Sequence, residues 1–68
     1  MNLEFKTAMR ECYITRSGKR VVVGLEPLSS EKRYFVSVRM PGTIEEVIAN
    51  ECSRREAMQI AKEQYYAA

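Results

Sequence analysis

Residues 53–66, Ser-Arg-Arg-Glu-Ala-Met-Gln-Ile-Ala-Lys-Glu-Gln-Tyr-Tyr, decide how the rest of this 68-residue sequence is interpreted. Ser53 is followed three residues later by Glu56, which is the pattern of a capping box. In that motif each side chain accepts a hydrogen bond from the backbone N–H of the other residue at the start of a helix. The sequence therefore predicts a helix that begins at Ser53.

The apolar side of this predicted helix indicates what it packs against. On a helical wheel its apolar and small residues, together with one glutamine, fall within an arc of roughly 160°: Ala57, Met58, Ile60, Ala61, Gln64 and Tyr65. The two alanines would let the helix approach a sheet closely, and a helix this short is marginal without such docking. We therefore expect this arc to face a β-sheet.

Two upstream segments show the alternation of β-strands. Residues 20–26 place Val21, Val23 and Leu25 on one face, and they follow a turn in which Gly18 is the natural position for a positive φ. Residues 33–40 alternate in the same way. Because one helix covers only one face of a sheet, Phe35 is expected to be exposed on the other face.

The remaining segments are less regular. Residues 3–14 change phase, so we expect a bend or bulge near residues 8–11. Residues 44–51 follow a Pro41-Gly42 turn and form either a returning strand or a short helix capped by Thr43 and Glu46. The strand is favoured, because the apolar side of such a helix would not be continuous with the apolar arc of the helix that begins at Ser53. The predicted fold is α+β, with an antiparallel three- to four-stranded meander sheet and one C-terminal amphipathic helix packed on one face, in a single domain of residues 1–68.

The composition excludes most catalytic mechanisms. The sequence contains no His, no Trp and no Asp, so it lacks a near-neutral imidazole base and most metal ligands. Cys12 and Cys52 lie 40 positions apart without a second pair, which is neither a zinc spacing nor a disulfide framework. We expect buried thiols, no enzymatic activity, no cofactor and no metal.

The distribution of charged residues limits where the protein is expected to be located and what it is expected to bind. Residues 1–11 carry charges in every short window, which is unlike a signal peptide or a membrane span. A cytoplasmic protein that does not bind membranes is therefore expected. The net charge of +2 permits nucleic-acid binding without favouring it.

Two sets of residues are candidate binding sites. The first is a helix stripe of four residues within roughly 60° on the outer side of the predicted helix: Arg55, Gln59, Lys62 and Tyr66. Tyrosine and arginine are enriched in protein interfaces, and cations at positions 54 and 55 oppose the helix dipole. Together with Phe35, the helix stripe is the predicted protein-binding site, and a homodimer that covers Phe35 is a further expectation. The alternative is a nucleic-acid site on the hairpin and sheet, formed by Arg16, Lys19, Arg20, Arg33 and Arg39.

Residues 46–65, Glu-Val-Ile-Ala-Asn-Glu-Cys-Ser-Arg-Arg-Glu-Ala-Met-Gln-Ile-Ala-Lys-Glu-Gln-Tyr, carry a resemblance to three families. This strand, serine cap and Glu-Ala helix resembles segments of the RNA polymerase inhibitors of T7-type phages, of HicB-like antitoxins and of the arm-binding domains of tyrosine integrases. The resemblance covers under a third of the chain. It implies a small phage or mobile-element accessory protein that inhibits or modulates a bacterial macromolecular machine. The absence of catalytic residues, together with Tyr66 on the helix stripe, motivates the first hypothesis, which is a non-enzymatic protein-binding module. The alternative is a small nucleic-acid-binding module.

Overall fold

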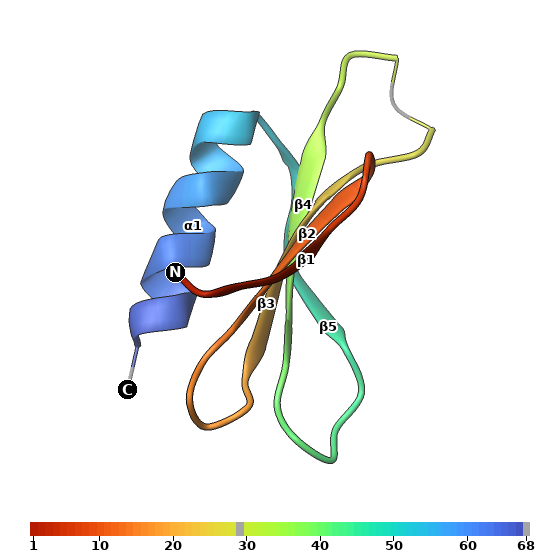
Figure 1. Cartoon of the computed structure of the whole chain (residues 1–68). Helices are drawn as coiled ribbons and strands as arrows, with labels where there is room; N and C mark the ends of the chain where they lie inside the picture. The colour runs from red at the N-terminus through yellow and green to blue at the C-terminus, as the bar shows by residue number, and fades with distance from the viewer. Residues whose placement is uncertain (29, 68) are drawn as a thin grey trace.

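The chain folds into a five-stranded antiparallel sheet with one helix on one face (Figure 1). The computed structural model describes residues 1–28 and 30–67. Its elements are β1 (Leu3–Lys6), β2 (Arg10–Ile14), β3 (Arg20–Leu25), β4 (Tyr34–Arg39), β5 (Glu46–Cys52) and α1 (Arg54–Tyr66). The strands lie side by side in chain order, β1-β2-β3-β4-β5. The predicted fold class is confirmed, with one strand more than the upper bound expected.

The additional strand arises at the predicted break in phase. Thr7 donates its N–H to the carbonyl of Arg10 at 2.8 Å, and its Oγ1 accepts hydrogen bonds from the N–H groups of Met9 and Arg10 at 3.2 and 3.0 Å. A side chain that binds the backbone two and three residues ahead stabilises a tight turn. Residues 3–14 therefore form the β1–β2 hairpin and not one bent strand.

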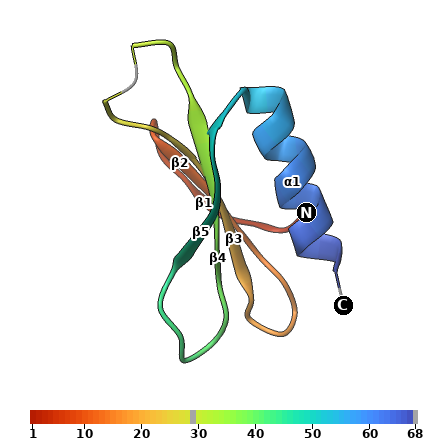
Figure 2. The same ribbon diagram turned by 180° about the vertical axis from the view of Figure 1, so that it is seen from behind.

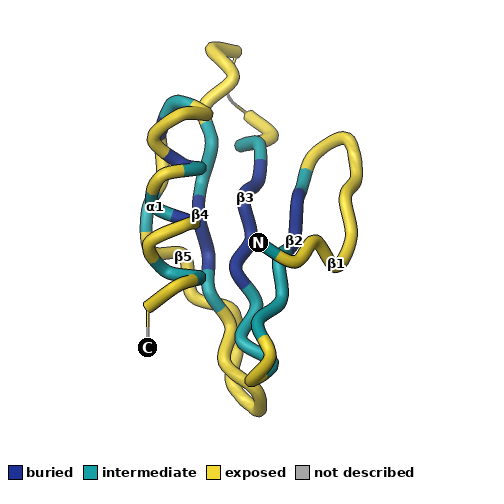
Figure 3. The backbone as a smooth tube through the Cα atoms, turned by 60° about the vertical axis from the view of Figure 1, so that its left-hand side comes forward, coloured by how far each residue is buried: buried dark blue, intermediate teal, exposed yellow. Residues whose placement is uncertain are grey.

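The core lies between α1 and the three strands that it covers, β3, β4 and β5. Val21, Val23, Val36, Ala57 and Ala61 are almost completely buried there. The larger side chains of the predicted arc pack around them, namely Met58, Ile60 and Tyr65. Figure 3 shows that the buried segments lie in the middle strands, whereas β1 is exposed along its length. The prediction that the two alanines permit close docking of the helix is thus confirmed.

β5 confirms the strand interpretation of residues 44–51. Thr43 caps no helix. Instead, its Oγ1 accepts from Met40 N at 3.1 Å and donates to the Met40 carbonyl at 2.7 Å, which closes the β4–β5 turn. The pairing of β5 with β4 is irregular in two places, and Glu51 adopts a φ of 53°. β5 is an edge strand whose free side faces away from β4.

The capping box forms as predicted. Ser53 Oγ accepts from Glu56 N at 3.1 Å, and Glu56 Oε1 accepts from Ser53 N at 3.0 Å. No helix of the described residues is long and apolar enough to cross a membrane.

Replacement of Ser53 by alanine should destabilise the fold by about 1 kcal/mol, since one N–H of the first helical turn loses its acceptor. Thermal unfolding followed by circular dichroism measures this change. A Ser53→Asp variant is the matched control, because aspartate also caps helices. Equal loss of stability in both variants would show that the cap contributes nothing.

Candidate functional site

The open face, which is the face of the sheet that α1 leaves uncovered, is covered in part by ion-paired side chains. Figure 2, seen from behind, shows that α1 stays on one side of the sheet. Arg20 donates from Nε and Nη2 to the two carboxylate oxygens of Glu4, at 2.8 and 2.9 Å. Glu4 also accepts from Cys12 Sγ at 3.4 Å. This pair shields the β2–β3 half of the open face, where Cys12 and Val22 are buried.

Phe35 lies on the open face in β4, the strand next to the edge strand β5. Its cross-strand neighbour is Gly24, and a Cβ built on Gly24 would lie 2.3 Å from Phe35 Cζ. The ring can therefore occupy this position only because residue 24 has no side chain. The Arg10 guanidinium lies over the ring, 5.6 Å from its centroid, and donates to Glu45 Oε2 at 2.7 Å. Phe35 is consequently half-buried. The sequence-based prediction that it is exposed is therefore only partly right.

Replacement of Gly24 by alanine should displace the Phe35 ring and destabilise the fold by about 1 to 2 kcal/mol. In a Phe35→Ala background the same change should be neutral or stabilising, because glycine within a strand is itself unfavourable. Chemical denaturation of the four proteins in this cycle measures the sign change. An identical effect of Gly24→Ala in both backgrounds would show that the ring does not require the glycine.

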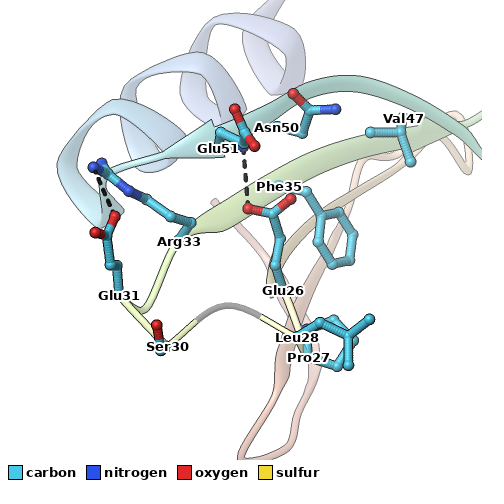
Figure 4. Close-up of a pocket in the computed structure, with 10 residues that line it drawn as sticks. All are labelled: Glu26, Pro27, Leu28, Ser30, Glu31, Arg33, Phe35, Val47, Asn50 and Glu51. Atoms are coloured by element: carbon cyan, nitrogen blue, oxygen red, sulfur yellow. Dashed lines mark hydrogen bonds and ion pairs between the residues drawn. The ribbon is translucent and has the colours of Figure 1, made fainter.

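A hollow of about 940 Å³ lies beside Phe35, between β5 and the loop that joins β3 to β4. We call it the β5 groove. Figure 4 shows Phe35 pointing into the groove, with Val47 on β5 and Pro27 and Leu28 on the loop around it. Val47 is 55 % exposed and Leu28 is 99 % exposed. The groove thus has an apolar lining that is formed by β4, the edge strand β5 and the β3–β4 loop.

Carboxylates form the rim of the β5 groove. Glu26, Glu31 and Glu51 line it, and Arg33 is the one cation among its described lining residues. Arg33 Nη2 lies 3.5 Å from Glu31 Oε2. Glu26 Oε2 accepts from the backbone N–H of Glu51 at 3.2 Å, which connects the loop to β5. Three carboxylates against one guanidinium leave the groove with two net negative charges, although the whole chain carries +2.

The helix stripe lies on the outer side of α1, across the sheet from Phe35. Arg55, Gln59 and Lys62 are exposed, and a smaller hollow of about 360 Å³ borders the first two. Tyr66 is 68 % exposed. Its hydroxyl accepts from the Met1 amine at 3.2 Å, and its ring meets the Tyr65 ring edge-on at 4.9 Å. The structure therefore brings four of the five predicted protein-binding residues together and separates them from the fifth.

Four of the five residues of the predicted nucleic-acid site lie at one end of the sheet, and Arg33 lies at the other end. Arg16 and Lys19 lie in the β2–β3 loop, Arg20 and Arg39 are cross-strand neighbours, and Arg33 lies beside the β5 groove. Four of them have acceptors inside the chain. Lys19 Nζ donates to the Gln64 carbonyl at 2.6 Å, and Arg39 Nε donates to the Thr43 carbonyl at 3.0 Å. The ion pairs of Arg20 and Arg33 are described above.

A buried carboxylate connects the sheet to the start of α1. Glu11 is 7 % exposed, and it accepts hydrogen bonds from the Tyr13 hydroxyl and the Arg54 guanidinium. Burial raises the pKa of Glu11, but these two hydrogen bonds and the nearby cations outweigh it, so the pKa lies below the ordinary value. Arg54 also lies over the Tyr34 ring, 5.6 Å from its centroid. This contact accounts for an arginine in the first turn of the helix.

Neither thiol is poised for chemistry. Cys12 and Cys52 are both buried and free, as expected. Burial and the hydrogen bond to Glu4 raise the pKa of Cys12 to about 11, and burial raises the pKa of Cys52. Both thiols are therefore protonated at neutral pH. Only the deprotonated thiolate is a strong nucleophile. Among residues 1–28 and 30–67, no group of three or more potential ligands is placed to hold a metal ion.

Comparisons of the chain with protein-family models, curated proteins and solved structures find no match. Its function therefore has to be inferred from its own surfaces.

Proposed function

We propose that this chain is a non-catalytic protein-binding module and that its open face is the principal binding surface. It would act by occupying a surface of its partner, as small inhibitors and accessory factors do. The observation that carries the proposal is the β5 groove, in which the half-buried Phe35 ring borders an exposed Val47.

The distribution of apolar side chains supports this choice. Val47 and Leu28 are exposed apolar side chains that line the β5 groove. Ile44 is also exposed, but it lies in the turn between β4 and β5, outside the groove. Exposed apolar residues that gather around a hollow and have a charged rim are typical of interaction sites. The helix stripe is a second candidate surface, although Tyr66 already has partners within the chain.

The nucleic-acid alternative receives less support. Four of its five cations already bind acceptors within the chain, so phosphate contacts would have to replace these interactions. Titration with duplex DNA and RNA at 50 and 200 mM salt separates the two functions, because every phosphate contact steepens the salt dependence. The proposal predicts no salt-dependent binding, and a steep dependence would favour the alternative.

Affinity capture from the source cells tests the protein-binding function when surface variants are compared. We expect Val47→Lys, on the open face, to reduce capture of the specific partner at least tenfold, as loss of a central interface contact does. Leu3→Lys, on the opposite edge strand β1, is the matched control and should retain it. Arg55→Glu tests the helix stripe. A protein profile that is identical for all three variants would contradict the proposal.

A further inference from the structure

We infer that the β5 groove binds a short segment of a partner protein in which an apolar side chain is flanked by lysines or arginines. This inference rests on the proposed function and adds the chemistry of the partner. It follows from the apolar lining, the charge of the rim and the irregular edge of β5.

The Phe35 ring, which forms the inner part of the apolar lining, is held in place within the chain. The Phe35 ring lies against Gly24 and beneath the Arg10 guanidinium. Glu45 holds that guanidinium and also accepts a hydrogen bond from the buried Ser37 hydroxyl. A pocket whose side chains are already ordered loses little entropy on binding. An apolar side chain can therefore enter between Phe35 and Val47 without rearranging the sheet.

The rim selects the charge of the partner. Glu26, Glu31 and Glu51 outnumber the single guanidinium of Arg33 in the groove. Complementary charges around an apolar contact steer association and suppress partners of the wrong sign. Cationic side chains on both sides of the apolar residue would meet these carboxylates. Phosphate groups of a nucleic acid would meet them as well and be repelled.

A second copy of the chain fits this edge poorly through its own β5. β5 carries Glu46 and Glu51 and has no lysine or arginine. Pairing of β5 with β5 of another copy would bring the carboxylates of both copies onto one ladder, and like charges opposite each other destabilise such pairs. The occupant must therefore supply the cations that β5 lacks.

The backbone of β5 also limits how a partner can bind. Its pairing with β4 shifts register between Tyr34 and Val36 and again between Val36 and Ser37. The N–H of Glu51 is already bound to Glu26. Bulged edges resist the addition of a long strand. Recognition therefore depends mainly on side chains in the groove, which makes a short segment sufficient.

Three synthetic peptides of equal length test this inference by NMR titration of the ¹⁵N-labelled protein. Their sequences are Lys-Leu-Lys-Phe-Lys-Leu-Lys, Lys-Ser-Lys-Ser-Lys-Ser-Lys and Glu-Leu-Glu-Phe-Glu-Leu-Glu. We expect only the first peptide to shift the amide signals of residues 26–28, 30–35 and 46–51. Its binding should weaken severalfold between 50 and 300 mM salt, because exposed charges are screened.

Two pairs of variants locate the binding energy. Removal of two rim charges in Glu26→Gln/Glu51→Gln should weaken the first peptide about fivefold. Glu63→Lys makes the same change in net charge at an exposed position on α1 and should leave the affinity unchanged. Val47→Lys should abolish binding, whereas Leu3→Lys should not. The ¹⁵N spectrum of each variant verifies that it is folded.

Each alternative occupant gives a different result. Three outcomes would each overturn the inference. The first two peptides could give equal responses, the shifts could be confined to residues 55–66, or the mass of the protein could double with concentration while peptide binding is lost. If the peptides fail but Val47→Lys still abolishes capture of a cellular partner, the proposed function stands and the partner chemistry is wrong. If both fail, the open face is not a binding surface.

Discussion

Replacement of Val36 by alanine should lower the free energy of unfolding by about 2 to 3 kcal/mol, the larger part of the stability of a domain this small. Val36 is fully buried at the centre of β4, paired with Val23 on one side and Ala49 on the other. The change removes buried methyl groups and leaves a cavity beneath the helix. Because a single core of this size supplies only about 3 to 5 kcal/mol, the melting temperature should fall by about 10 to 20 °C.

Val47→Ala is the matched control for this cavity. It removes the same atoms from the neighbouring strand at a position that is 55 % exposed, so the change should stay within about 0.5 kcal/mol. Urea denaturation of both variants measures the difference. Similar losses at the two positions would mean that the core does not lie between α1 and the middle of the sheet.

Replacement of Glu11 by alanine is expected to destabilise the fold by about 2 to 3 kcal/mol. The change removes a charged acceptor from the Tyr13 hydroxyl and from Arg54, and buried hydrogen bonds to charged groups are stronger than neutral ones. Glu46→Ala, at an exposed position on β5, is the control and should stay within about 0.5 kcal/mol. An equal effect of both variants in chemical denaturation would deny Glu11 this role.

The same carboxylate predicts how stability depends on pH. The pKa of Glu11 in the folded chain lies below its ordinary value, despite the opposing effect of burial, because Tyr13 and Arg54 bind the charged form. Its stabilisation is therefore complete above the ordinary pKa of about 4.3 and is lost as the pH falls through the lower value of the folded state. The difference in stability between the wild type and Glu11→Gln should be largest near pH 7 and shrink towards pH 3. A difference that stays constant over this range would contradict the assignment.

Features that depend on neighbouring residues could be predicted from the sequence. The capping box needs only Ser53 and Glu56, and the turn at Gly18 needs only its own positive φ, which is 89° in the structure. The apolar arc of α1 follows from helical periodicity alone. The hairpin of β1 and β2 was only half anticipated, because a break in phase does not reveal whether the chain bends or reverses. Thr7, with its hydrogen bonds to the turn, was the signal for reversal.

Features that depend on distant residues could not be predicted. Arg54 had no evident role in the helix, since its partner Glu11 lies 43 positions earlier in the chain. Phe35 was expected to be exposed because one helix covers only one face of the sheet. Its pairing with Gly24 could not be foreseen, since it depends on the register of β3 against β4. The β5 groove likewise exists only where the β3–β4 loop meets β5. In each case the sequence shows which side chains are present, but it does not show which distant residues they contact.

The central claim is that another protein covers the open face and not the outer side of α1. Hydroxyl-radical footprinting of the chain, alone and with its captured partner, tests this most directly. The labelling of Leu28, Phe35 and Val47 is followed, and Leu3 and Tyr66 serve as internal references. The account predicts protection of the first three side chains and unchanged labelling of the references. Protection of Tyr66 with unchanged labelling of Phe35 and Val47 would contradict it and assign the interface to the helix stripe.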